Sequence, residues 1–212
     1  MDMQFARPWS IIQPRVYRFL EQQYVDQFFE DGTLLLSSFE RFAKHRDEQR
    51  KDENEGKGVR TLTGPEFTAV MATGRGHDCY VLCGSTANTD TIRKCFSDAD
   101  GCLAIDNPLQ FANLVSSHVP AFAGGFAGHC IYQDKLEIRR HSESASMENL
   151  MPQSLEDLQK LADAAGGIEE LFLKHAQFAG QSEYRMLWRS NLPIQDPLII
   201  KCPEARSACR RL

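Results

Sequence analysis

Short apolar runs alternate with polar and turn residues over the first forty positions, and they predict regular elements. Residues 14–20 place β-branched and aromatic side chains after a proline, which is typical of a strand that opens a sheet. Residues 21–31 carry apolar side chains three and four positions apart and precede Gly32, so they predict a helix with a glycine stop. Residues 33–39 form a second buried run. The chain is therefore expected to begin strand–helix–strand.

The middle of the chain predicts two more strands and two helices. The apolar runs at 78–84 and 102–105 predict the strands, with a short helical segment between them at 91–96. Asp106 to Pro108 is typical of a helix start, because a side-chain oxygen can cap free N–H groups and proline tolerates the first turn. The body of this helix is expected over 109–118, packed on the sheet.

Weaker patterns follow in the next part of the chain. Residues 128–132 and 135–139 flank a two-residue connection and predict a hairpin. Residues 141–152 are polar and rich in serine, which predicts a surface loop. Residues 154–157 fit a capping box that opens a helix, and another helix is predicted over 168–175.

Residues 181–188 alternate between two kinds of side chain, as a half-buried strand does. One face would carry Ser182, Tyr184, Met186 and Trp188, and the other would carry Gln181, Glu183, Arg185 and Leu187. The first face is mostly apolar and is expected on the core of a strand over 181–189. Gln181 and Glu183 would then project side by side into solvent or a cleft.

Charged residues are concentrated in one internal segment and at the end of the chain. Residues 40–60 carry thirteen charges of mixed sign, a pattern that favours a solvated helix or loop. A last strand is predicted over 197–202, followed by a basic tail with Arg206, Arg210 and Arg211.

The composition places these elements in one α+β domain over residues 1–212. Of the 212 residues, 42% are hydrophobic and 25% are charged, as in ordinary globular proteins. The net charge of −5 disfavours tight non-specific binding to nucleic acid. The longest apolar stretch, 119–132, contains three glycines and a histidine and cannot supply the ~20 apolar residues of a membrane span. No membrane contact is expected.

The cysteines, the histidines and the first residues refine this expectation. The seven cysteines are an odd number without a CxxC pair, so they are expected to be reduced thiols. The six histidines lack HxxxH and HxH spacing, so no metal site is predicted. The N-terminus lacks the basic and apolar blocks of a secretory signal, and a cytoplasmic location is expected.

Three short segments suggest a function through their order along the chain. Arg18 lies in Val-Tyr-Arg-Phe-Leu on the first strand, Ser85-Thr86 follows Tyr-Val-Leu-Cys-Gly, and Gln181-Ser-Glu183 opens a late strand. In this order the chain resembles the ADP-ribosyltransferase superfamily, in the branch that uses an arginine, a serine and a glutamate. Four further stretches are Tyr-Arg-Phe with Leu-Ser-Ser-Phe, the region of Asp52 and Glu55, Leu-Cys-Gly-Ser with Gly-Cys-Leu-Ala-Ile-Asp, and Glu-Tyr-Arg. Through them the chain is also similar to a group of uncharacterised bacterial proteins found in accessory and defence contexts, which is the basis for expecting a toxin or phage-defence effector.

The resemblance implies a split, mainly antiparallel β core flanked by helices, with NAD as a substrate. Cleavage of the nicotinamide–ribose bond develops positive charge on the ribose, which a carboxylate can stabilise. Glu183 would take this role at the ribose 2′-hydroxyl, Gln181 would orient the acceptor, and Arg18 would pair with the NAD phosphates. Ser85 would hold the ribose or Glu183.

The serine role is open between two places in the sequence. Ser37 and Ser38, at the end of the second strand, compete with Ser85 for it, and together with Thr86 they are counted among the residues that would bind the cofactor. In the family's usual motif a second serine follows the threonine, where this chain has Ala87.

Each site residue also has a purely structural interpretation. Arg18 could extend from a strand end toward solvent, Ser85 could be a turn residue, and Glu183 could form a surface ion pair with Arg185.

The expected activity is transfer of ADP-ribose from NAD to a protein or a nucleic acid, with release of nicotinamide. An antitoxin or inhibitor protein is a further possible partner. Two alternatives remain at this point: a non-enzymatic binding or regulatory module of the same fold, and an NAD glycohydrolase in which water is the acceptor.

Overall fold

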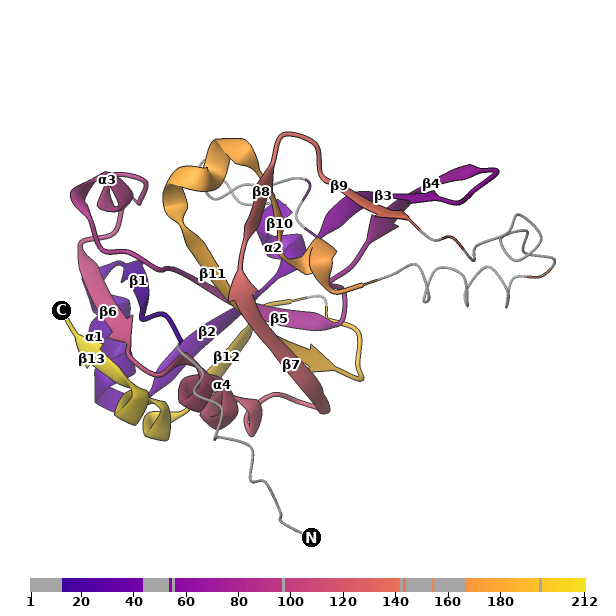
Figure 1. The fold of residues 1–212 in the computed structure, drawn as a ribbon. Helices are drawn as coiled ribbons and strands as arrows, with labels where there is room; N and C mark the ends of the chain where they lie inside the picture. The colour runs from indigo at the N-terminus through magenta and orange to yellow at the C-terminus, as the bar shows by residue number, and fades with distance from the viewer. Residues whose placement is uncertain are drawn as a thin grey trace, which may run out of the picture.

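The computed structural model describes residues 13–43, 54, 56–96, 98–141, 143, 154, 167–194 and 196–212. These residues form a mixed α/β fold with few helices, whose largest unit is an eight-stranded antiparallel sheet, here called the main sheet (Figure 1). Its strands are β1 (Val16–Leu20), β2 (Thr33–Ser38), β5 (Cys79–Ser85), β6 (Gly101–Ile105), β7 (Phe122–His129), β11 (Glu183–Ser190), β12 (Leu198–Lys201) and β13 (Cys209–Arg211).

The main sheet divides along β5. One edge of β5 pairs with β11 over its whole length, from Cys79 to Ser85. The other edge pairs with β2 only at Tyr80 and Val81, and with β1 only at Ser85. From there β2 continues outward to β12, whereas β1 continues to β6 and β13. The two halves therefore separate beside the middle of β5.

A glycine permits the close approach of β1 to β5 at this division. A Cβ atom on Gly84 would lie 2.4 Å from the Val16 Cγ1 atom and 2.8 Å from the Tyr17 carbonyl oxygen. Real side chains do not approach this closely, so a larger residue would push β1 away from β5.

The principal core lies on one face of the main sheet. The helices α1 (Gln22–Asp31) and α4 (Pro108–Ser116) and the 3₁₀ helix η4 (Pro203–Ala208) cover this face. Met186 and Trp188 from β11 are buried here, and the Trp188 indole donates a hydrogen bond of 2.9 Å to the Ala112 carbonyl of α4. The prediction that the Tyr184, Met186 and Trp188 face lies on the core is therefore confirmed.

The opposite face carries a smaller core beside the division. The helix α2 (Phe39–Ala43) and the 3₁₀ helix η2 (Glu169–Leu171) pack there. Leu187 of β11 is 2% exposed in this core. The expected polar face of 181–188 is thus buried as well, because η2 and α2 cover it.

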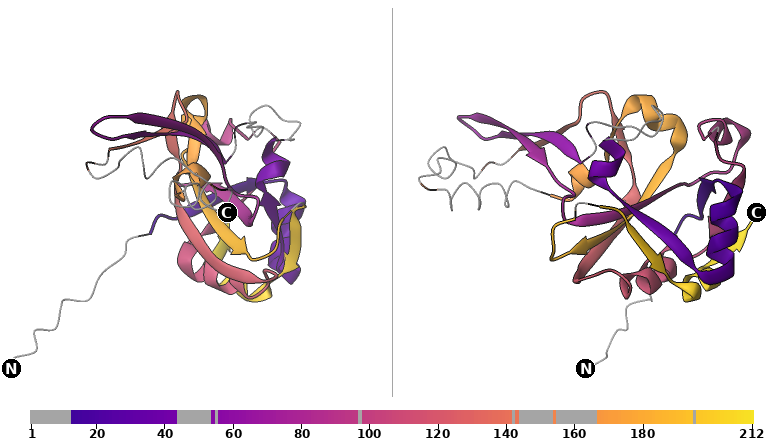
Figure 2. Two further views of the ribbon diagram at one scale, coloured as in Figure 1. Left: turned by 90° about the vertical axis from the view of Figure 1, so that its right-hand side faces the viewer. Right: turned by 180° about the vertical axis from the view of Figure 1, so that it is seen from behind.

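A second sheet, the arm, projects from the body in every view (Figures 1 and 2). It consists of β3 (Lys57–Thr63), β4 (Thr68–Gly74) and β9 (Glu137–His141). A buried ion pair joins its base to η2: the Arg60 guanidinium binds Glu170, which also accepts a hydrogen bond of 2.9 Å from the Thr73 hydroxyl. The neighbouring Glu169 binds Arg60 at 2.9 Å and also Arg140 of β9.

Most elements predicted in the first half of the chain are confirmed. Residues 16–20, 22–31 and 33–38 form strand, helix and strand, and Gly32 ends α1 in the left-handed conformation with φ of 80°. The predicted strands at 78–84 and 102–105 are β5 and β6.

The two predicted helices of this region are also present. The helix α3 (Asp90–Arg93) replaces the helical segment expected at 91–96. At the start of α4, the Asn107 side chain caps the helix by accepting a hydrogen bond of 3.0 Å from the Gln110 N–H, and Pro108 occupies the first turn.

Two predictions about local structure are wrong, and two strands were missed. Residues 128–139 form no hairpin: β8 (Ile131–Gln133) pairs in parallel with β10 (Leu173–His175), and β9 pairs in parallel with β3. Residues 168–175 form η2 and β10 rather than one helix. The arm strands β3 and β4 were not predicted. The pairings of β8 with β10 and of β9 with β3 span long sequence separations, which local patterns do not reveal. β4 is the sequence neighbour of β3, so the β3–β4 pairing was missed although it is local.

The basic end of the chain is part of the fold and not a free tail. Residues 203–208 form η4 and β13 pairs with β6. Arg206 donates to the Phe29 and Glu30 carbonyl groups at 3.0 and 3.1 Å, Arg210 lies 3.3 Å from Asp106, and Arg211 pairs with Asp26. The sequence alone does not show these contacts, but in the fold each of the three arginines is already paired with a group of the same chain.

Some predicted segments lie partly or wholly outside the described residues. The helix expected after Ser154 and most of the loop at 141–152 lie outside the described residues, as does much of the charged segment 40–60. All seven cysteines are described, and none of them forms a disulfide bond with another described residue. No helix in the described residues combines the length and the apolar character that a membrane span requires.

The buried pair at the base of the arm makes a testable prediction. Glu170→Gln removes the fully buried one of the two carboxylates that bind the Arg60 guanidinium, so the free energy of unfolding should fall by about 3 kcal/mol. Urea denaturation measures the change. In the matched control, Lys201→Gln removes an ion pair whose lysine is 71% exposed, and its effect should stay below about 1 kcal/mol. Equal effects in the two variants would show that the pair does not support the arm.

Candidate functional site

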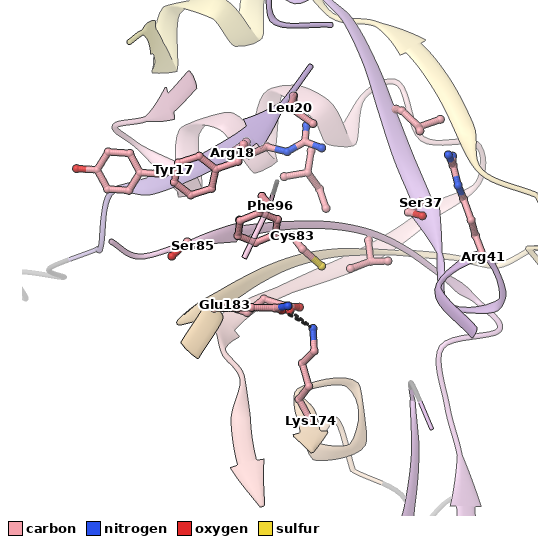
Figure 3. A pocket seen from close by; sticks show the side chains of 16 residues that line it. Tyr17, Arg18, Leu20, Ser37, Arg41, Cys83, Ser85, Phe96, Lys174 and Glu183 are labelled. Carbon is pink, nitrogen blue, oxygen red and sulfur yellow. Dashed lines mark hydrogen bonds and ion pairs between the residues drawn. The ribbon is translucent and has the colours of Figure 1, made fainter. Parts of the chain in front are cut away.

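A pocket occupies the space where β1 and β2 separate beside β5. Its lining comes from β1, β2, β5 and β11, and from α2, β10 and the 3₁₀ helix η3 (Ala176–Gln181). Arg18 and Glu183 both line it, although they belong to opposite ends of the described chain. Figure 3 shows Arg18 on one side of the pocket and Glu183 with Lys174 on the other, while Ser37 and Arg41 lie along a third side.

Glu183 begins β11 and is buried, with 6% of its surface exposed. It lies directly opposite Ser85 in the pairing of β11 with β5, so both residues belong to the same face of the sheet. Its backbone N–H donates a hydrogen bond of 2.7 Å to the Tyr132 hydroxyl of β8. The start of β11 is therefore held by its pairing with β5 and by the hydrogen bond to β8.

Two cations hold the Glu183 carboxylate. The Lys174 ammonium of β10 binds Oε2, and the Arg185 Nε donates a hydrogen bond of 2.7 Å to Oε1. Arg185 is 0% exposed and also donates a hydrogen bond of 2.6 Å to the Leu171 carbonyl of η2. The Glu183–Arg185 pair thus exists as the sequence suggested, but it is buried and belongs to a network rather than to the surface.

The charge state of Glu183 follows from these contacts. Burial alone would raise the pKa of Glu183, but the charges of Arg185 and Lys174 outweigh burial and hold the pKa well below its ordinary value. The carboxylate is therefore ionised at neutral pH. A carboxylate has about four lone-pair positions, so it can still accept a hydrogen bond from a ligand.

Gln181 reaches the site by a different backbone path from the predicted one. It ends η3 instead of lying on β11, and Ser182 follows in the left-handed conformation with φ of 46°. Its Oε1 atom nevertheless accepts a hydrogen bond of 3.1 Å from the Lys174 ammonium. Gln181 and Glu183 are therefore neighbours in the pocket, joined through Lys174.

The serine candidates separate clearly. Ser37 and Ser85 line the pocket, and Ser85 is 0% exposed with its Oγ accepting a hydrogen bond of 3.3 Å from the Ala87 N–H. Ser38 is outside the lining, and its Oγ accepts a hydrogen bond of 3.3 Å from the Arg41 N–H at the start of α2. Its assignment as a cofactor-binding residue is not supported, because the side chain serves the helix.

Thr86 has a structural role next to the site. Its backbone N–H and its hydroxyl donate to the Ser182 carbonyl at 2.9 and 3.3 Å. It is outside the pocket lining. Thr86 fixes the turn that precedes Glu183, and it does so without facing the pocket.

Apolar side chains form the wall on the β1 side. Tyr17, Phe19 and Leu20 line the pocket together with Phe96. Phe19 and Phe96 stack with their ring centroids 5.3 Å apart. The pocket thus combines an apolar wall with a charged wall, which suits a ligand that carries both apolar rings and anionic groups.

Two pocket residues carry charge that the sequence did not reveal. Lys174 was assigned to a helix, and Arg41 was counted among the solvated charges of segment 40–60. Neither belongs to a recognisable motif, and only the pairing of β10 with β8 and the position of α2 after β2 bring them to the pocket. The only local signal for Lys174 was an isolated cation in an apolar run.

Comparison with known proteins gave no match: no family model, no curated protein and no solved structure matches this chain.

Lys174→Met tests the network around Glu183. With one cation removed, the pKa of Glu183 should rise, and the free energy of unfolding at pH 7 should fall by about 3 kcal/mol. In the native protein the pKa is below its ordinary value of 4.5, so the stabilisation is complete above that pH and is lost as the pH falls through the lowered pKa. The stability difference between the two proteins should therefore narrow in acid.

Urea denaturation at pH 7 and at progressively lower pH measures this difference. The exposed Lys135→Met is the matched control, and its stability should stay within about 0.5 kcal/mol of the native protein. A difference for Lys174→Met that is the same at every pH would contradict the electrostatic account.

Proposed function

We propose that this protein is an NAD-dependent ADP-ribosyltransferase, which moves ADP-ribose from NAD to a macromolecular acceptor. The observation that carries the proposal is the shared pocket: Arg18, Ser85, Gln181 and Glu183 come from three distant segments and line one cavity. These are the segments in which the sequence resembles the arginine–serine–glutamate branch of that superfamily. These four residues therefore lie on the same side of the molecule.

The reaction breaks the bond between ribose C1′ and the nicotinamide nitrogen. Nicotinamide leaves with the bonding electrons, C1′ then bonds to the acceptor atom, and the acceptor loses one proton to solvent. Positive charge on the ribose is greatest while the first bond is long. A carboxylate fixed at that point lowers the barrier without having to reorganise.

Glu183 meets the electrostatic requirement for this role. It is ionised, buried and fixed by Lys174 and Arg185. Its open lone pairs would accept a hydrogen bond from the ribose 2′-hydroxyl. Gln181, bound to the same ammonium group, would orient the acceptor.

The other walls fit the remaining parts of NAD. Arg18 would bind the pyrophosphate, because a guanidinium stays charged and can donate two parallel hydrogen bonds. Arg41 also lines the pocket and would provide a second cation for the same group. Phe19 and Phe96, which stack on each other, belong to the apolar part of the lining, where one of the planar rings of NAD would lie.

The serine role falls to Ser85 in this proposal. Ser85 lies opposite Glu183 in the strand pairing, where a hydroxyl can support the ribose or the carboxylate. Ser37 lines the pocket on the β2 side, nearer to Arg41, and would contact the cofactor at its phosphate end.

The acceptor in this proposal is a protein or a nucleic acid, and the biological role is that of a toxin or defence effector acting in the cytoplasm. The arginines of the C-terminal strand are already paired within the fold, which favours a protein acceptor. Labelled NAD incubated with cell lysate, followed by separate protease and nuclease treatment, identifies the acceptor class. Release of free ADP-ribose alone would instead indicate an NAD glycohydrolase.

Glu183→Gln is the principal test of the reaction. Loss of the negative charge at the developing cation should lower the rate of nicotinamide release by at least ~100-fold. Glu137→Gln removes a carboxylate that pairs with Arg139 on the arm, and it should leave the rate unchanged. Nicotinamide release at the native rate in Glu183→Gln would remove Glu183 from the mechanism.

Folding must be separated from catalysis in this test, because Glu183→Gln leaves two buried cations without their carboxylate. The double variant Lys174→Gln/Glu183→Gln removes one of those cations as well. If it melts near the native temperature and is still inactive, the loss is catalytic. Nicotinamide release by the double variant at the native rate would count against the proposal.

Arg18→Gln tests the cofactor contact. Removing one charged hydrogen-bonding partner should raise the KM for NAD by about 10- to 100-fold, corresponding to roughly 1.5–3 kcal/mol, while kcat changes little. Arg139→Gln, at a side chain that is 75% exposed on the arm, is the matched control. An unchanged KM in Arg18→Gln would mean that the guanidinium does not bind NAD.

A further inference from the structure

Away from the pocket, three potential metal ligands meet where α4 and η4 pack together. His118 follows the C-terminal turn of α4, Cys202 precedes η4, and Glu204 lies in its first turn. One ligand atom from each residue, the imidazole nitrogen, the thiol sulfur and a carboxylate oxygen, lies within 4.8 Å of the others. None of the three lines the pocket proposed for NAD.

The three atoms are of the kinds that bind zinc. Imidazole nitrogen, thiolate sulfur and carboxylate oxygen are its ordinary ligands, at about 2.0–2.3 Å from the metal. In tetrahedral geometry these bond lengths place the ligand atoms roughly 3.3–3.7 Å apart. The imidazole Nε2 and carboxylate Oε1 already lie 2.8 Å apart. Adjustments of roughly 1 Å would therefore complete the geometry.

The backbone fixes the thiol, and the other two ligands can adjust. Cys202 is 0% exposed, and its N–H donates a hydrogen bond of 2.9 Å to the Gly32 carbonyl. Gly32 permits this contact, since a Cβ there would lie 2.3 Å from the Pro203 nitrogen. The side chains of His118 and Glu204 are 30% and 44% exposed, so they can rotate, and solvent can supply a fourth ligand.

Glu204 connects the other two members of the cluster. Its carboxylate lies 2.8 Å from the His118 imidazole and also interacts with the Cys202 thiol. The buried Cys202 sulfur turns a surface pair into a set of three different zinc ligands drawn from two segments. Since these segments are far apart in the sequence, the spacing of histidines and cysteines along the chain could not have predicted the cluster.

We propose that His118, Cys202 and Glu204 form a binding site for a thiophilic divalent cation, zinc in the first instance, with water as the fourth ligand. Bound zinc would join the end of α4 to the start of η4, two elements that cover the principal core. The site is structural in this proposal and is independent of any reaction in the pocket.

Zinc binding to the full chain tests the proposal. The protein is freed of metal with a chelator, its thiols are kept reduced, and zinc is titrated against a chromophoric competitor. One equivalent should bind to the native protein with a Kd of about 1 μM or tighter, and zinc should raise the melting temperature. His118→Gln and Glu204→Gln change exposed side chains and should each weaken binding at least ~10-fold, with the thermal shift reduced accordingly.

Cobalt(II) provides a separate readout for the thiolate. The native protein with cobalt should show a sulfur-to-cobalt charge-transfer band, which Cys202→Ser should abolish. His141→Gln and Cys95→Ser, at a histidine and a cysteine outside the cluster, are the matched controls and should behave as the native protein does.

Three results would overturn the proposal. The first is the absence of stoichiometric zinc binding by the native protein. The second is a zinc affinity of His118→Gln and Glu204→Gln that equals the affinity of the native protein, which would identify adventitious binding by other thiols. The third is bound cobalt without the charge-transfer band.

Discussion

The structure around the pocket depends on the buried carboxylate of Glu183. A charge in the interior is tolerated only when partners surround it. Lys174 supplies one partner from β10, and Arg185 supplies the other while binding the Leu171 carbonyl of η2. The network therefore holds β10 and η2 against β11. The residues that would perform chemistry and the residues that close this side of the fold are the same residues.

The division of the main sheet supplies the space that this carboxylate faces. β5 pairs fully with β11 on one edge but meets β1 and β2 only near its two ends on the other. At Gly84 the backbone of β1 passes too close for any side chain, which sets where the halves separate. A continuous sheet would have filled the same region with backbone hydrogen bonds. The pocket is thus a product of topology and not of a loop.

The sequence predicted those features that depend on neighbouring residues and failed on those that depend on distant ones. The spacing of apolar residues was sufficient to predict β1, α1 and β2. The alternation from Tyr184 to Trp188 identified the face of β11 that packs on the principal core. Motif order predicted that Arg18, Ser85 and Glu183 share a site, and all three line the pocket. Lys174 and Arg41 were missed because an isolated cation has no sequence pattern that distinguishes solvent from a pocket. The arm was missed because β3 begins in a charged segment and pairs on one side with β9, far along the chain; its pairing with the neighbouring β4 on the other side is local and was missed as well.

The last described strands complete the main sheet. β12 completes the outer side of β2, and β13 completes the outer side of β6, while Ala205 and Ala208 of η4 are buried in the principal core. Each of these strands pairs with a strand that precedes it by more than 100 residues. The main sheet therefore closes through contacts of very long sequence separation, which form slowly. Until residues 198–211 are in place, β2 and β6 would each expose an unpaired strand edge.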